Sequence, residues 1–103
     1  MASAKIVATA QRILSGELGI VAGARQLSGL RFDVGAEHEA DFIFFVGVDS
    51  ETDHLPVGGV RSRWSSDALK AKDEELQIYE TSVRDKAFRV CQSLIQRYET
   101  HDA

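Results

Sequence analysis

The stretch D-A-L-K-A-K-D-E-E-L-Q-I-Y-E-T-S-V-R-D-K-A-F-R-V-C-Q-S-L-I-Q-R-Y, residues 67–98, decides the fold class. Its apolar residues recur every seven positions at Leu69, Leu76, Val83 and Val90, and charged residues lie between them. This spacing places the apolar side chains on one face of an α-helix. The sequence therefore predicts a long amphipathic helix in the last third of the chain.

The length of this helix raises a packing problem. A continuous helix over these residues is about 48 Å long at 1.5 Å per residue, whereas a chain of this size has a radius of gyration of about 13 Å. We expect one of two solutions. Either the helix breaks near Thr81 and Ser82, where Ser82 and Asp85 form an S-x-x-D helix-start pattern, or a second copy of the chain covers the excess apolar stripe between Leu69 and Tyr98.

Two shorter helices are predicted in the first third of the chain. Residues 3–14 carry apolar side chains at helical spacing, with Ser3 as a candidate N-cap. After a short break, residues 17–27 form a second amphipathic segment, so the two segments predict a helical hairpin. Gly19 and Gly23 share one face of the second helix and predict a notch into which a neighbouring element packs.

The middle of the chain is harder to assign. Residues 31–41 are polar and predict a surface loop. The run F-I-F-F-V-G-V, residues 42–48, suits a buried strand by composition and a buried helix by the spacing of Phe42, Phe45 and Val46. We favour a helix, because the next apolar segment is short and broken by glycines. The alternative is an α+β fold with a short strand pair at 42–48 and 57–61.

These elements together predict a mainly α fold. We expect a small helical bundle of four to five helices in one domain over residues 1–103. Hydrophobic residues make up 44% of the chain, which is enough to build a single core in a chain of this length.

The charge and the cysteine content limit the environment and the partners. Twelve Lys and Arg against sixteen Asp and Glu give a formal net charge of −4, which weakens attraction to nucleic acids and anionic membranes. The single cysteine, Cys91, forms no C-x-x-C pair and predicts a buried, inert thiol in a reducing compartment. No signal-peptide or membrane-span pattern occurs. We therefore expect a cytoplasmic protein that binds neither nucleic acid nor membrane.

The segment V-D-S-E-T-D-H-L-P-V-G-G, residues 48–59, is the candidate site. With the arginines that follow it, it supplies a polar cluster of Asp49, Glu51, Asp53, His54, Arg61 and Arg63. Carboxylate and imidazole groups bind metals and transfer protons. The nearest metal pattern, the EF-hand loop, needs glycine at position six and glutamate at position twelve, where this chain has His54 and Val60. We therefore expect no metal, no cofactor and no catalytic residue.

The same segment has the composition of a polar turn. Asp49, Ser50 and Thr52 have short side chains that bond nearby backbone groups, and Pro56 ends a helix at or before Leu55. Arginine pairs with carboxylates through two parallel hydrogen bonds. The cluster then either locks the turn internally or displays a charged recognition surface.

A helix-start pattern follows the turn. Ser65 is placed as an N-cap, with Trp64 before it and Leu69 at the fourth helical position, which is the spacing of a hydrophobic staple. This pattern predicts a buried Trp64 that sets the direction of the chain.

Part of the chain resembles a known family. The stretch F-V-G-V-D-S-E-T-D-H-L-P-V-G-G-V-R-S-R-W, residues 45–64, followed by A-L-K-A-K-D-E-E, is similar to a family of small bacterial proteins classed as a domain of unknown function. The resemblance extends to I-L-S-G-E-L-G-I-V-A-G-A-R-Q-L, residues 13–27. It implies a bacterial, single-domain, cytoplasmic protein and assigns no catalytic residue.

The leading functional hypothesis is a small acidic helical protein that acts through protein–protein contacts. The partner is either a second copy, in a homodimer, or another protein, and the role is regulatory or toxin-neutralising. The alternative is an enzyme or metal-binding protein centred on Asp49, Glu51, Asp53 and His54. Nucleic-acid regulation through Arg61 and its neighbours is disfavoured by the net charge.

Overall fold

The fold is helical throughout the residues that the structure describes. A computed structural model of the chain describes residues 1–99. Within them lie α1 (Ala2–Ser15), α2 (Ile20–Leu30), the 3-10 helix η1 (Arg31–Val34), α3 (Ala40–Glu51), the 3-10 helix η2 (Gly58–Arg63) and α4 (Ser66–Glu99). The predicted mainly α bundle is confirmed. The alternative strand pair is wrong, since residues 42–48 lie in α3 and residues 58–61 lie in η2.

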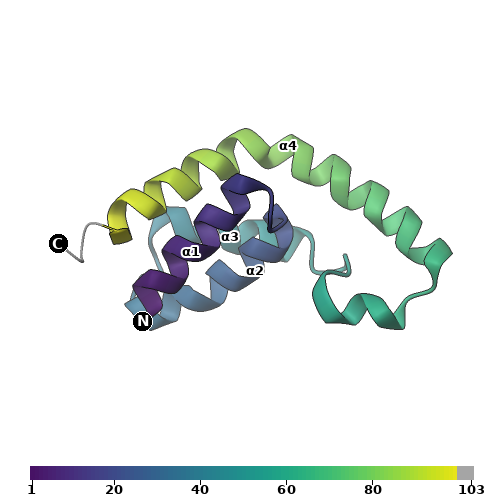
Figure 1. The fold of residues 1–103 in the computed structure, drawn as a ribbon, viewed down its shortest axis with the longest axis horizontal. Helices are drawn as coiled ribbons and strands as arrows, with labels where there is room; N and C mark the ends of the chain where they lie inside the picture. Colours follow the sequence, from purple (N-terminus) through teal and green to yellow (C-terminus); the bar gives the residue numbers. More distant parts are fainter. Residues whose placement is uncertain (100–103) are drawn as a thin grey trace.

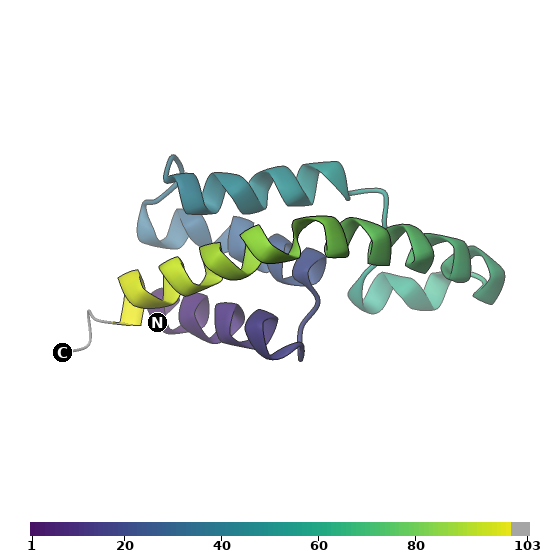
Figure 2. The same ribbon diagram turned by 90° about the horizontal axis from the view of Figure 1, so that it is seen from above.

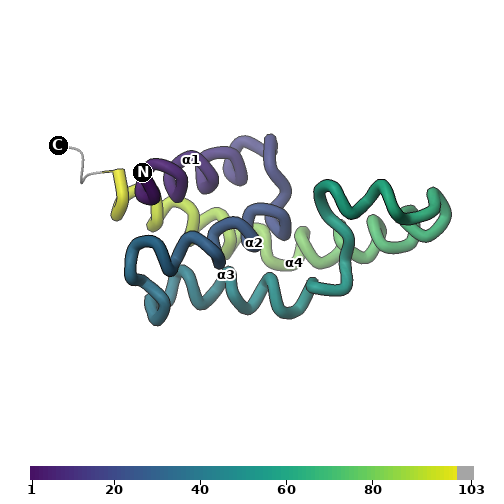
Figure 3. Tube along the Cα trace, turned by 90° about the horizontal axis from the view of Figure 1, so that it is seen from below, coloured from purple at the N-terminus to yellow at the C-terminus, as the bar shows by residue number. Residues whose placement is uncertain are grey.

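Three helices and the second half of α4 make up the bundle. α1 and α2 form a hairpin, α2 packs on α3, and α4 contacts all three of them. Figures 1 and 2 show α4 running along the whole length of the molecule, and Figure 3 shows the same arrangement from below. The first half of α4 extends beyond the bundle together with η2 (Figure 1).

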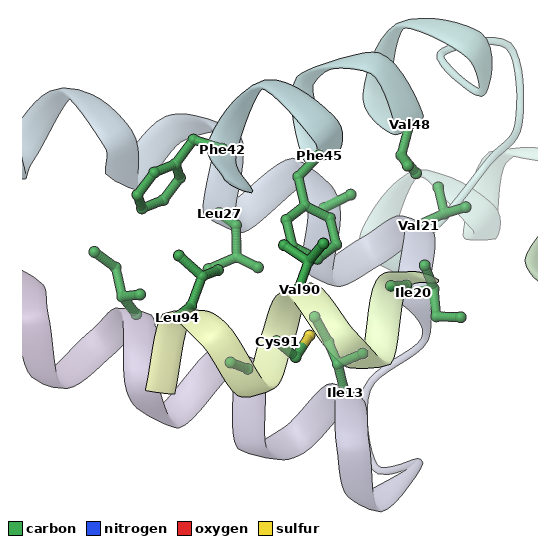
Figure 4. Packing of buried hydrophobic residues seen from close by; sticks show 14 of the residues in the cluster. Ile13, Ile20, Val21, Leu27, Phe42, Phe45, Val48, Val90, Cys91 and Leu94 are labelled. Carbon is green, nitrogen blue, oxygen red and sulfur yellow. The ribbon is translucent and has the colours of Figure 1, made fainter. Parts of the chain in front are cut away.

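The core is formed by the apolar faces of all four α-helices (Figure 4). Phe42 and Phe45 of α3 are completely buried, as are Leu27 of α2 and Leu94 of α4. The ring of Phe42 also meets the ring of Tyr98 edge to face, with 6.1 Å between the ring centroids. Such aromatic pairs add to the stabilisation that comes from burial alone.

The burial pattern of α3 explains why its sequence was ambiguous. Phe42, Phe45 and Val48 are buried and follow one another at intervals of three residues, as one side of a helix does. Ile43 and Phe44 point away from this side and are apolar as well. The run therefore lacks the polar face by which an amphipathic helix is recognised.

The predicted glycine notch is confirmed at Gly23, whereas Gly19 precedes α2 as its N-cap residue and faces a different element. A Cβ atom added at Gly23 would lie 2.3 Å from Cδ1 of Ile13 on α1, and one added at Gly19 would lie 3.2 Å from Oε2 of Glu80 on α4. The Glu80 carboxylate accepts a hydrogen bond of 2.9 Å from the backbone N–H of Val21, in the first turn of α2. A side chain from α4 thus caps α2, because helix starts leave such N–H groups without a partner.

Two local predictions in the first third need correction. α1 begins at Ala2 without a side-chain hydrogen bond at its cap, so Ser3 lies inside the helix and is not its N-cap. Residues 31–41 are not one loop: they open with η1 and close with the first residues of α3. Gly35 ends η1 with φ of +67°, a conformation that glycine adopts without strain.

α4 is one continuous helix of 34 residues. The molecule measures 49 × 25 × 24 Å, and its longest dimension follows this helix (Figure 1). The predicted break near Thr81 and Ser82 is wrong, because the Ser82 hydroxyl donates to the carbonyl of Tyr79 inside the helix, over 2.6 Å. Residues 52–65 of the same chain fold back beside the projecting part of α4 (Figure 1), where Arg61 pairs with Asp73. We call residues 57–78 the arm.

Candidate functional site

The base of the arm is fixed by buried groups. The buried Thr52, just after α3, donates its hydroxyl to the carbonyl of Val48 over 2.7 Å. Leu55 is also buried. Gly58 has φ of +68°, which allows the chain to turn into η2. These contacts set the direction in which the arm leaves the bundle.

Arg25 of α2 holds the same connection from the bundle side. Its Nη2 donates to the carbonyl oxygens of Thr52 and Leu55, the second at 2.9 Å, and its Nε lies 3.3 Å from Oδ1 of Asp49. Carbonyl groups at the end of a helix have no N–H partner within the helix. The guanidinium supplies one here, and Asp49 holds that guanidinium in place.

Arg61 and Asp73 connect η2 to α4. The two terminal nitrogens of Arg61 donate to the two carboxylate oxygens of Asp73 at 2.6 and 2.8 Å, and one of them also lies 3.3 Å from the carbonyl of Pro56. The hydrogen bonds from Arg61 hold the pKa of Asp73 below its usual value, and the same contact raises the pKa of Arg61. The expected arginine–carboxylate pair forms, but its carboxylate comes from α4.

Two more contacts hold the polar segment against α4. The Tyr79 hydroxyl donates to Oε1 of Glu51 over 2.7 Å, and Nε2 of His54 is hydrogen-bonded to Oε2 of Glu75. Burial, together with the Glu51 contact, raises the pKa of Tyr79. The hydrogen bond with His54 lowers the pKa of Glu75. At neutral pH this phenol is therefore protonated and this carboxylate is ionised.

The four residues of the enzyme or metal hypothesis do not converge on one point. Asp49 and Glu51 contact different helices, and the nearest approach of Asp53 to His54 is 4.0 Å. Across residues 1–99, no group of three or more His, Cys, Asp or Glu side chains is arranged to hold a metal. In the observed geometry Asp49 pairs with Arg25 of α2, Glu51 accepts a hydrogen bond from Tyr79 of α4, and His54 is hydrogen-bonded to Glu75 of α4.

The arm exposes apolar side chains both near its outer end and near the bundle. The predicted N-cap at Ser65 is confirmed, because its hydroxyl oxygen accepts a 3.2 Å hydrogen bond from the backbone N–H of Ala68. Trp64 is less buried than predicted and is 38% exposed. Val60 is 48% exposed and Ile78 is 73% exposed. The arm therefore offers apolar surface to solvent.

The thiol of Cys91 belongs to the core and not to a site. Cys91 is completely buried, and burial raises its pKa to about 12. The thiol is therefore protonated at neutral pH, and the thiolate is the nucleophilic form of cysteine. The predicted buried and inert thiol is confirmed.

The sequence prediction missed the partners that α4 supplies. Asp73 and Glu75 belong to the charged residues between the apolar positions, and the sequence pattern predicted no contact for them, for Tyr79 or for Glu80. One signal was present: Asp73 and Glu80 are one heptad apart and flank the stripe of Leu69, Leu76 and Val83. Acidic groups beside an apolar stripe are placed to contact whatever covers that stripe.

Comparison with family models, with curated proteins and with solved structures found no match for this chain. Among residues 1–99, no helix combines the length and the apolar character that a membrane crossing requires. A functional proposal therefore rests on the geometry of the arm.

Proposed function

We propose that this chain acts through protein–protein contacts in the cytoplasm and that the arm is its contact surface. The observation that carries this proposal is the exposure of Val60, Trp64 and Ile78 within one projecting element. Large apolar side chains exposed along a projecting element offer the kind of surface through which proteins bind partners.

The residues at the outer end of the arm have the composition of a binding hot spot. Tryptophan and arginine are the residue types most enriched among side chains that dominate interface energies. Trp64 follows the exposed Arg63 directly, and the side chain of Arg63 makes no hydrogen bond or ion pair within residues 1–99. Both side chains are therefore free to contact a partner.

The contacts at the base of the arm support a binding role. Arg61 bound to Asp73, Tyr79 bound to Glu51 and the anchored residue Thr52 restrict the arm before any partner arrives. A surface that is already ordered loses less conformational entropy on binding. The polar cluster then positions the recognition surface and does not itself perform chemistry.

We propose a second copy of the chain as the first candidate partner. Most homo-oligomers are two-fold dimers, in which the same surface of each copy meets its equivalent. An arm that projects from one end of an elongated molecule can meet a second arm without a clash between the bundles. Pairing of the arms would bury Trp64 and Ile78 in both copies.

Light scattering over a range of micromolar concentrations tests the dimer. The wild type should show a concentration-dependent mass, and a Trp64→Ala, Ile78→Ser double variant should remain monomeric with unchanged helical circular dichroism. Ile43→Ser is a matched control, because Ile43 is exposed on α3, away from the arm. A wild type that is monomeric at every concentration, or an Ile43→Ser variant that alone loses association, would refute pairing through the arm.

The biological role is a separate part of the proposal. A neighbouring toxin gene would support the toxin-neutralising form, and a neighbouring group of metabolic genes would favour the enzyme alternative. No contact of the polar cluster favours that alternative, because the side chains of Asp49 and Glu51 are turned toward different helices.

A further inference from the structure

The bundle carries a groove that plays no part in the proposed arm contact. It lies between α1 and α2 and has a volume of about 530 Å³. Ala8 on α1 and Gly29 and Leu30 on α2 supply small or apolar surface to it. A volume of this size falls within the range of about 300–1,000 Å³ that is common for sites that hold small molecules.

Gly29 keeps the groove open although packing does not require a glycine there. A Cβ atom added at Gly29 would have no heavy atom within 4 Å, and the residue does not have a positive φ. Gly23 on the same helix differs, since a Cβ atom there would collide with Ile13. Glycine inside a helix is destabilising relative to alanine. The absence of a side chain at position 29 therefore leaves space over the groove without helping the fold.

All the charged side chains that line the groove are basic. Lys5, Arg12 and Arg25 line it and no acidic side chain does, in a chain whose net charge is −4. Two of these cations are already paired, Arg12 with Glu17 at 3.0 Å and Arg25 with Asp49 at 3.3 Å.

Lys5 is the cation left for a ligand, because it makes no ion pair within residues 1–99. α1 and α2 run antiparallel through a short connection, so Lys5 and Leu30 lie together at the end of the groove away from that connection. The lining segment of α1 spans about 10 Å from residue 5 to residue 12. This length is short for a bound protein helix and suits a small molecule.

We infer that this groove binds a small amphipathic anion, with the apolar body of the ligand over Ala8, Gly29 and Leu30 and its acidic head beside Lys5. The apolar surface favours burial of a hydrocarbon chain, and the unpaired ammonium favours one negative charge at its end.

The probe is decanoate below its micellar concentration, with decanol as the neutral control of equal chain length. Binding is measured by calorimetry and mapped by backbone amide chemical shifts. Decanoate should bind and shift the amides of α1 and α2. Lys5→Ala should weaken the binding of decanoate by about fivefold, as expected for the loss of a partly exposed ion pair, and should leave the binding of decanol unchanged. Lys70 is an exposed lysine of the arm, and Lys70→Ala should change the binding affinity of neither ligand.

Filling the groove tests the apolar half of the inference. Gly29→Leu should abolish the binding of both ligands without lowering the thermal midpoint. Gly47→Leu is the matched control, since Gly47 lies in α3 and also has open space around its position. Equal binding of decanoate and decanol to the wild type, shifts confined to the arm, or full binding by Gly29→Leu would each overturn the inference. Shifts of the groove amides on raising the protein concentration alone would assign the groove to a second copy and overturn it as well.

Discussion

Gly23→Ala and Gly29→Ala place the same methyl group at two positions of one helix and should have opposite effects. At Gly29 the methyl group meets open space, so only helix propensity acts and stability rises by about 1 kcal/mol. At Gly23 the methyl group would lie 2.3 Å from Cδ1 and 2.5 Å from Cγ1 of Ile13. Ile13 is buried and its β-branched side chain is restricted, so it cannot simply rotate away.

The magnitude follows from two opposing terms at Gly23. Overpacking a filled core costs about 1–3 kcal/mol, and the propensity gain of about 1 kcal/mol offsets part of it. The free energy of unfolding of Gly23→Ala should therefore fall by up to about 2 kcal/mol. The difference between the two variants, about 1–3 kcal/mol, measures the cost of the steric clash with Ile13.

Urea unfolding followed by helical circular dichroism measures both values. With a slope of about 1–3 kcal/mol per molar urea, the two midpoints should differ by roughly 1 M. Equal slopes are needed, because a changed slope means that the unfolded state changed as well. A Gly23→Ala variant as stable as Gly29→Ala would show that α1 and α2 are not in the close contact described.

Three further outcomes are expected. Glu80→Ala should lower the free energy of unfolding by about 1 kcal/mol through loss of the cap on α2. Glu74 lies on α4 as well but is exposed, and Glu74→Ala should leave the urea midpoint unchanged. Arg61 holds the pKa of Asp73 below its usual value, so their contact stabilises the fold fully above the ordinary carboxyl pKa of about 3.9, and this stabilisation is lost as the pH falls through the lowered pKa. An NMR titration of the Asp73 carboxyl should show a midpoint below about 3.9 in the wild type and a midpoint of about 3.9 in Arg61→Ala. A thiol reagent should modify Cys91 only as fast as the protein unfolds, and rapid modification with the helical signal intact would contradict its burial.

Periodicity predicted the helices because it records which side of each element meets the core. The heptad of Leu69, Leu76 and Val83 identified α4, whereas a helix was favoured for α3 because the next apolar segment is too short and glycine-rich to be its partner strand. Periodicity does not record which element covers a stripe. The sequence therefore did not predict that residues 52–65 of the same chain fold back beside α4 (Figure 1).

The candidate site was predicted in part for the same reason. The polar segment and its arginines were identified, because short polar residues and glycines restrict local conformation. Their partners were not, since Asp73 and Tyr79 lie outside the segment and only the tertiary fold brings them to Arg61 and Glu51. The exposure of Trp64 was mispredicted because a staple pattern specifies a neighbour in sequence and not how much of the indole that neighbour covers.

The cap that Glu80 places on α2 also orders events during synthesis. The hydrogen bond joins Val21 to a residue 59 positions later, and α1 likewise packs on the last helix. A ribosome adds about 5–20 residues per second, so the first hairpin waits for seconds with its core face uncovered. Contacts between distant residues form slowly because a long loop must close first. Until residues 66–99 have emerged, the nascent N-terminal half therefore exposes apolar surface of the kind that chaperones bind.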